Sequence, residues 1–139
     1  MQRRSLITVG KLAGIDTSVK AAMRTVCKND HRSREEIVDS MNELTHAAGI
    51  RITGGNAKQL SLPTLEKWLS PTAMDQVPSV RALVVFCEVM GDVSPLSALA
   101  EPLEARIINR DEARILRLAE IEEEIKELKK RKKMLEAAR

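Results

Sequence analysis

The C-terminal stretch of the chain, residues 106–139, reads RIINRDEARILRLAEIEEEIKELKKRKKMLEAAR. It contains neither glycine nor proline, the two residues that most strongly interrupt a helix. The stretch therefore predicts one continuous helix of about 30 residues. It decides the fold class, because a long amphipathic helix must bury its apolar stripe against a partner.

Apolar residues recur along this helix with the heptad spacing of a coiled coil. With residue 118 at position a, five of the six a and d positions are apolar. These seam positions are Leu118, Ile121, Ile125, Leu128, Lys132 and Leu135. Ile at a beside Leu at d favours a coiled coil of two helices, and a lysine at one a position disfavours larger assemblies. The pattern predicts that residues 105–139 form a homodimeric coiled coil.

Charged residues beside the seam predict the orientation of the two helices. In a parallel dimer, each g residue faces the next e residue of the partner. All three such pairs are opposite in charge: Arg117 with Glu122, Glu124 with Lys129, and Arg131 with Glu136. An antiparallel pairing centred on residue 124 would place Glu124 on Glu124 and Arg117 on Arg131, and both pairs repel. The sequence predicts a parallel homodimer, and the alternative is one amphipathic helix folded back on its own head.

Capping and stop signals divide residues 16–104 into five short helices. The clearest start is a capping box at residues 33–36, in which Ser33 accepts from the backbone N–H of Glu36 and the Glu36 side chain reaches back. Four more helices are expected at about 16–28, 61–69, 78–90 and 94–100. Gly49 ends the helix that begins at Ser33 as a left-handed cap, and Gly91 closes the one that begins at Pro78. Residues 1–15 are expected to form an N-terminal arm or loop.

Composition supports helices rather than sheets. Trp68 and Phe86 are the only aromatic residues in 139, so the core must consist of Leu, Ile, Val, Ala and Met. The predicted fold is all-α: a compact five-helix bundle with a helix-turn-helix-like core, followed by the long coiled-coil helix. The helix at 78–90 is apolar almost all round and is expected to be central and buried. Residues 50–53 alternate apolar and polar, which indicates a short extended segment or a small hairpin arm.

The net charge and the types of reactive residues limit the classes of function that the sequence allows. The net charge of +3 and the pI near 9.0 permit nucleic-acid binding without requiring it. The scarcity of aromatic rings argues against single-strand binding by base stacking. Cys27 and Cys87 lack metal-ligand spacing, and neither His31 nor His46 accompanies a nucleophile motif. We therefore expect no catalysis, no metal and no cofactor. No stretch has the length of a signal sequence or a membrane span, which predicts a cytoplasmic protein.

An ordered set of short motifs in the head carries a resemblance to a known class. The motifs are Ser33–Val38 (SREEIV), Leu62–Leu69 (LPTLEKWL), then Pro78, and Cys87 leading to Gly91–Leu96 (GDVSPL). In this order, over about half of the chain, they resemble the helix-turn-helix domains of phage and prophage regulatory proteins, in the broad Cro/repressor-like class. The resemblance implies a regulator that binds double-stranded DNA in a bacterial host.

The resemblance also implies which residues contact DNA. The helix after Ser61 is the recognition helix, with Leu65 and Trp68 in the core and its polar residues toward the bases. Ser33 and Arg34 lie at the start of the preceding helix, where exposed N–H groups favour phosphate. The implied DNA-contacting residues are Ser33, Arg34, Arg51, Lys58, Gln59, Ser61, Thr64 and Lys67.

One feature departs from that pattern. A helix-turn-helix joins its helices by about three to four residues, whereas Gly49 to Ser61 is much longer. One possibility is that the turn carries an inserted arm around Arg51, which either contacts DNA or is only a loop. The other is that the two helices are not arranged as in a DNA-reading helix-turn-helix. The second functional hypothesis is a non-enzymatic adaptor or inhibitor that binds a host or phage protein through its helical surface or coiled coil.

Overall fold

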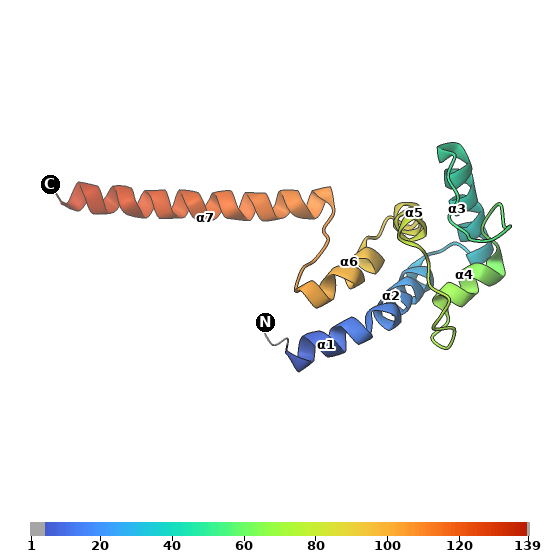
Figure 1. The fold of residues 1–139 in the computed structure, drawn as a ribbon. Helices are drawn as coiled ribbons and strands as arrows, with labels where there is room; N and C mark the ends of the chain where they lie inside the picture. The colour runs from blue at the N-terminus through green and yellow to red at the C-terminus, as the bar shows by residue number, and fades with distance from the viewer. Residues whose placement is uncertain (1–4, 139) are drawn as a thin grey trace. The chain divides into compact units, whose positions relative to one another are not determined.

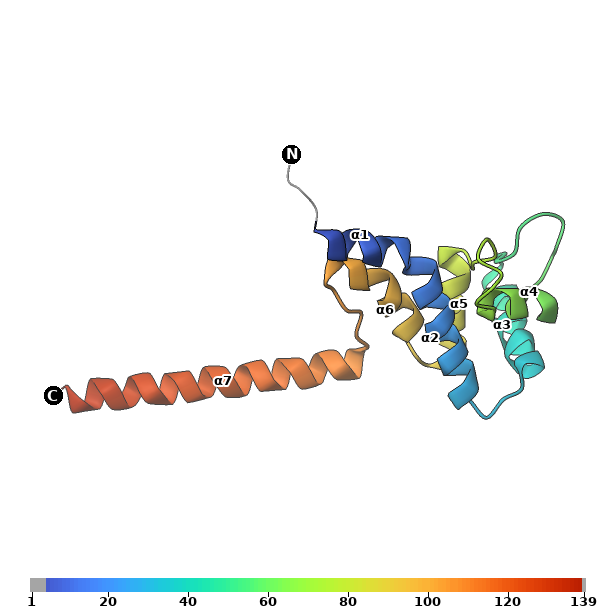
Figure 2. The same cartoon turned by 90° about the horizontal axis from the view of Figure 1, so that it is seen from below.

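The computed structural model describes residues 5–138, and within them it contains seven α-helices, one 3₁₀ turn and no strand. The chain divides into two compact units, Met1–Ile107 and Ile108–Arg139. The first unit, called the head below, holds α1 to α6, and the second holds α7 (Figures 1 and 2). The all-helical fold class predicted from the sequence is confirmed, including its long C-terminal helix.

The five helices predicted for the head are present, and a sixth precedes them. Their bounds are α1 (Leu6–Ala13), α2 (Ile15–Asn29), α3 (Arg34–Ala48), α4 (Leu62–Leu69), α5 (Val80–Met90) and α6 (Ser94–Ala100), with the 3₁₀ turn η1 (Glu101–Leu103) after α6. α2 packs along α6, α3 packs against α5, and α4 contacts both α2 and α3 (Figure 1). The count of five is therefore one short for the described residues.

The expected N-terminal arm is a helix over most of its described length. Residues 6–13 form α1, and the Ser5 hydroxyl caps it by accepting a hydrogen bond from the backbone N–H of Thr8 at 3.1 Å. Gly14 ends α1 and directly precedes α2. The arm prediction is wrong here because two glycines and a short apolar run look like a loop in sequence, while a serine cap suffices to start a helix. Residues 1–4 lie outside the described part.

Local capping signals locate α3 to α5 well. Ser33 and Ser61 each accept from the backbone N–H three residues on, at 3.1 and 3.3 Å. Gly49 has a φ of 65°, a left-handed conformation that glycine adopts without steric cost. The capping box at Ser33 is half formed, because the Glu36 carboxylate lies 3.2 Å from the Ser33 hydroxyl rather than on its backbone N–H.

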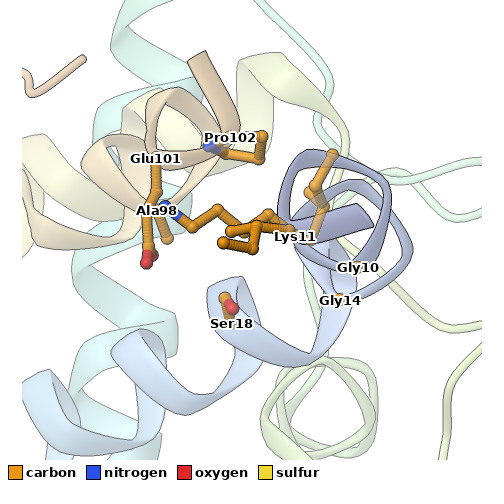
Figure 3. A pocket seen from close by; sticks show the side chains of 9 residues that line it. Gly10, Lys11, Gly14, Ser18, Ala98, Glu101 and Pro102 are labelled. Carbon is orange, nitrogen blue, oxygen red and sulfur yellow. The ribbon is translucent and has the colours of Figure 1, made fainter. Parts of the chain in front are cut away.

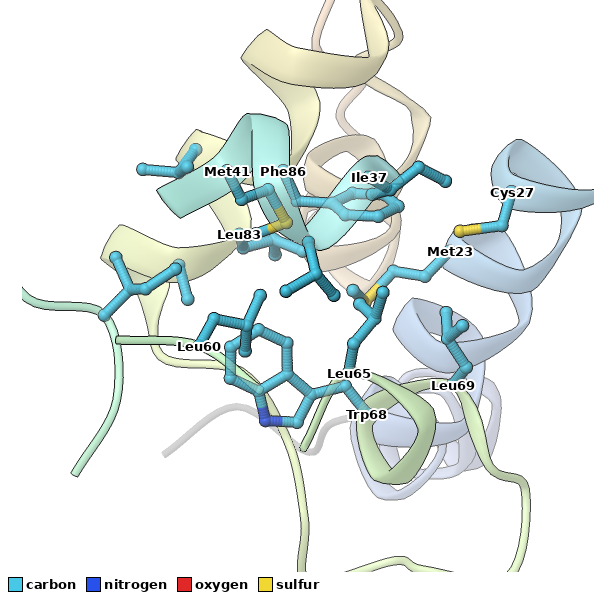
Figure 4. Packing of buried hydrophobic residues seen from close by; sticks show 14 of the residues in the cluster. Met23, Cys27, Ile37, Met41, Leu60, Leu65, Trp68, Leu69, Leu83 and Phe86 are labelled. Atoms are coloured by element: carbon cyan, nitrogen blue, oxygen red, sulfur yellow. The ribbon is translucent and has the colours of Figure 1, made fainter. Parts of the chain in front are cut away.

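The core of the head lies between α2, α3, α4 and α5 (Figure 4). Six apolar residues with no solvent exposure form its centre: Met23, Ile37, Met41, Leu65, Ala82 and Phe86. α5 is buried on one face only, since Val80 and Val84 are 71% and 49% exposed. The prediction of a central buried helix therefore holds for one face of α5 only, formed by the buried residues Ala82, Leu83, Val85, Phe86 and Cys87.

The long connection between α3 and α4 is a loop that is fixed at both ends. Ile52 and Leu60 are buried, and no strand forms between them. Asn42 of α3 clamps the second end, since its side-chain amide donates to the Leu60 carbonyl and accepts from the Leu60 N–H, both at 2.9 Å. Arg51 and Thr53 both donate to the Ala57 carbonyl, which closes the loop on itself.

The second unit consists of α7 (Arg110–Ala137), a single helix of 28 residues. It starts with a complete capping box between Asn109 and Glu112, whose spacing is a helix-start signal in the sequence as well. No residue of α7 is buried in the single chain. The helix therefore owes its form to local propensity and charge pairs.

Candidate nucleic-acid interface

α4 is the helix that the resemblance makes the recognition helix, and its ends have different surroundings. At its N-terminus, the Ser61 hydroxyl accepts from the Thr64 N–H and donates to the Thr64 hydroxyl at 3.0 Å. Both predicted contact residues therefore bond to each other in the free protein. Lys67 is exposed near the other end, while Leu65 and Trp68 are buried. The helix thus presents a polar face and packs an apolar one, as predicted.

Two cationic side chains of α2 hold the C-terminus of α4. Lys20 is fully buried, and its ammonium group donates to the carbonyls of Lys67 (2.7 Å), Trp68 (3.2 Å) and Gln76 (2.6 Å). Arg24 donates to the Leu69 carbonyl at 2.7 Å. The last carbonyls of a helix have no partner within it and carry partial negative charge, so cations there are favourable.

Burial lowers the pKa of Lys20 from its ordinary value, an effect that the nearby Arg24 charge adds to and Asp16 and Asp75 oppose. The three carbonyls match the three protons of a charged ammonium group, and this match compensates for the lost hydration. Sequence reasoning missed this anchor, because Lys20 stands in an ordinary helix and its acceptors lie 47 to 56 residues away.

The α3–α4 loop carries three of the predicted contact residues. Lys58 and Gln59 are exposed. Arg51 is exposed too, but one of its guanidinium nitrogens is engaged with the Ala57 carbonyl at 3.0 Å. Arg81 of α5 joins this group by donating to the Arg51 carbonyl at 3.4 Å. The loop and Arg81 of α5 therefore form a basic surface together. The sequence analysis did not single out Arg81.

A second basic surface lies at the corner between α2 and α3. A cleft of about 510 Å³ is lined by Ala21, Arg24, Thr25, Cys27, Lys28 and Arg34, and no acidic residue lines it. We call it the basic cleft. Among the described residues, Lys28 and Arg34 make no hydrogen bond or ion pair of their own. Both are exposed, so their charges are available to an anionic ligand.

Of the three cationic residues that line the basic cleft, the sequence analysis singled out one as a DNA contact. Arg34 was identified from its place at the start of α3, and Ser33 beside it is occupied as the cap of that helix. Arg24 and Lys28 are four residues apart on α2, which puts them on one face of that helix. That spacing was the available signal, but only the packing of α2 and α3 shows that Arg34 joins them.

The head also contains two buried thiols and a second cleft. Burial raises the pKa of the Cys27 and Cys87 thiols, and both residues are buried. A smaller cleft of about 300 Å³ lies between α1–α2 and α6–η1, with Lys11, Ser18 and Glu101 as its polar lining (Figure 3). Within residues 5–138 no three His, Cys, Asp or Glu side chains are placed to hold a metal ion.

The comparisons with known proteins found no matching protein family, no matching curated protein and no matching solved structure. In the described part of the chain, no helix has both the length and the apolar character needed to cross a membrane. The geometry of the head therefore carries the functional argument.

Proposed function

We propose that the protein is a dimeric, sequence-specific DNA-binding transcriptional regulator of the phage or prophage type, acting without catalysis in the cytoplasm of a bacterial host. The observation that carries the proposal is the basic cleft, where Arg24, Lys28 and Arg34 meet from two helices with no acidic residue in the lining. Such a cluster suits the phosphates of a DNA backbone, which supply most of the sequence-independent affinity.

The position of α4 supports a reading role for that helix. Arg24 lines the basic cleft and also bonds to the last carbonyl of α4, so the cleft and the C-terminus of α4 share one side chain. Backbone contacts at the cleft would then fix α4 in register on the duplex. Thr64 and Lys67 of α4, with Lys58 and Gln59 before it, are the side chains proposed to reach base edges.

Dimerisation through α7 is the second part of the proposal. The seam is exposed in the single chain: Leu118, Ile125, Leu128 and Leu135 all remain open to solvent. A partner helix would cover them, and the dimer would then present two heads to DNA. The g and e pairs of the sequence favour a parallel orientation over an antiparallel one centred on residue 124.

The test is binding of the full chain to a labelled duplex from its own upstream DNA, compared with a random duplex over a salt series. We expect tighter binding to the upstream duplex and a loss of roughly tenfold or more with Lys67→Ala, the scale of one base contact. Lys11→Ala, on α1, is the matched control and should bind as the parent does. No binding to either duplex at low salt would overturn the DNA-binding proposal.

A protein-binding adaptor is the second candidate, and one observation favours it. α1 exposes several large apolar side chains to solvent. Leu6 and Ile7 are 89% and 72% exposed, and Val9 is exposed as well. Exposed apolar patches can mark protein–protein interaction sites. If Leu6→Ser and Ile7→Ser together abolish function in cells while DNA binding in solution is unchanged, α1 is a protein-binding surface.

A further inference from the structure

The charges of α7 are separated along its length. Residues 120–127, the acidic block, contain five glutamates and one lysine. Residues 129–133, the basic block, are all lysine or arginine. In a parallel dimer each block lies beside its own copy, so that like charges face each other. An antiparallel dimer with the right centre places each acidic block beside a basic block.

Three of the six side chains in the parallel g–e pairs are already engaged within their own helix. The Arg117 guanidinium lies 3.1 Å from Glu120 and 3.7 Å from Glu124 of its own helix. The Lys132 ammonium lies 4.0 Å from the Glu136 carboxylate. Each of the three parallel g–e pairs includes Arg117, Glu124 or Glu136, so each competes with a pair inside the helix. A parallel dimer also stacks Lys132 on Lys132 in the seam.

An antiparallel register centred between residues 126 and 127 aligns the whole seam. It places Leu118 opposite Leu135, Ile121 opposite Lys132, and Ile125 opposite Leu128 of the second copy. The repulsive pairing of Glu124 with Glu124 belongs to a register shifted by one heptad, in which Leu118 lies opposite Leu128, so that repulsion does not apply here. The lysine now lies beside an isoleucine and close to the acidic block, where its stem can cover the seam while its ammonium finds a carboxylate.

The flanking charges agree with this register. In an antiparallel coiled coil, g faces g and e faces e. The facing pairs are Glu124 with Arg131 and Glu122 with Lys129, each occurring twice by symmetry. In the described single chain, Glu122 and Lys129 make no hydrogen bond or ion pair and are exposed, so that pair forms without breaking another.

We propose that α7 pairs antiparallel with α7 of a second copy, about a centre between Lys126 and Glu127. The inference rests on the homodimer in the proposed function and specifies how it is built. Because each chain enters α7 at residue 110, the two entry points lie about 50 Å apart along the coil, at 1.5 Å per residue. The heads therefore leave from opposite ends, and each binds its own DNA segment rather than one of two adjacent half-sites.

Two double variants of the full chain separate the orientations. Glu124→Lys with Arg131→Glu keeps both antiparallel pairs attractive and makes two of the three parallel pairs repulsive. Glu124→Lys with Lys129→Glu does the reverse: it makes both antiparallel pairs repulsive and preserves the parallel pair. Both variants share one substitution and leave the net charge unchanged, so each controls for the other.

The measurement is the dimer dissociation constant by sedimentation equilibrium at low salt. We expect the first variant to dimerise within about threefold of the parent and the second to be weakened at least about tenfold. The opposite order, or equal effects, overturns the antiparallel proposal. A parent chain that stays monomeric at high concentration overturns it as well, together with the dimer in the proposed function, while the DNA titration tests the head independently.

Cysteine cross-linking gives a second readout that does not depend on charge. In the antiparallel register, Leu118→Cys alone and Leu135→Cys alone place no two new thiols together, whereas the double variant does. We expect disulfide-linked dimers only from the double variant under mild oxidation. Linked dimers from either single variant indicate a parallel coil and overturn the proposal. The native Cys27 and Cys87 are buried, so the parent chain is the background control.

Discussion

The head and α7 reach the same secondary structure by opposite means. The helices of the head are short, between 7 and 15 residues, and are held by a core in which Ile37, Met41 and Leu65 have no exposure. α7 has 28 residues and none of them is buried. Isolated helices as short as those of the head are marginal in water, so packing must supply their stability. A long uninterrupted helix needs less help, which leaves its apolar seam available to a partner.

The largest expected difference between the two regions comes from truncating a leucine in each. Leu65→Ala opens a cavity in the core and should lower the free energy of unfolding by about 2–5 kcal/mol. Leu128→Ala, at 61% exposure in the single chain, should change unfolding of the head by less than about 0.5 kcal/mol. Trp68 lies in the head, so its fluorescence during urea denaturation reports that unit. Comparable losses in both variants would show that α7 packs on the head.

A second test concerns the cationic anchor of α4. Lys20→Met leaves three carbonyls without a donor and should cost about 1–3 kcal/mol in the free energy of unfolding. Amide exchange should accelerate first in α4 and in the segment around Gln76. Lys28→Met removes an exposed lysine from the same helix and should stay within about 0.5 kcal/mol of the parent. Equal effects of the two substitutions would mean that Lys20 does not hold α4.

The smallest expected effect is on acid stability. Hydrogen bonds from the Arg32 side chain and backbone lower the pKa of Asp30 well below its ordinary range. A carboxyl group whose pKa is lowered by folding stabilises the fold at pH values above its unfolded-state pKa of about 3.9. This contribution is lost as the pH falls from that value toward the lowered pKa. Asp30→Asn should therefore reduce the decline in unfolding midpoint between neutral and acid pH. Arg32 also donates to the Val89 carbonyl at 3.0 Å, so Asp30 and Arg32 together link the end of α2 to α5. If the variant's unfolding midpoint declines as much as the parent's, this link does not depend on the Asp30 charge.

The same contrast explains how much could be predicted from the sequence. Signals that act within four residues, such as the serine caps at Ser33 and Ser61 and the stop at Gly49, located the helices of the head. The helical form of α7 followed from its composition in the same way. α1 was missed because Gly10, Gly14 and a short apolar run look like a loop in the sequence.

The candidate site was less predictable, because its parts meet only through tertiary packing. Arg34 could be found from its place at a helix start. Arg24 and Lys28 could not, since nothing in their spacing shows that α3 brings a third cation to their face. The burial of Lys20 was hidden for the same reason: its acceptors belong to α4 and the segment after it.

The most direct test of the account is the salt dependence of DNA binding when the basic cleft is neutralised. If the cleft holds phosphate, Lys28→Gln with Arg34→Gln should reduce the slope of log affinity against log salt by about 2, one for each lost contact, with the fold intact. Lys11→Gln, on α1, should leave the slope unchanged. A double variant that binds DNA with the parent's affinity and slope would contradict the claim that the head contacts DNA through this cleft.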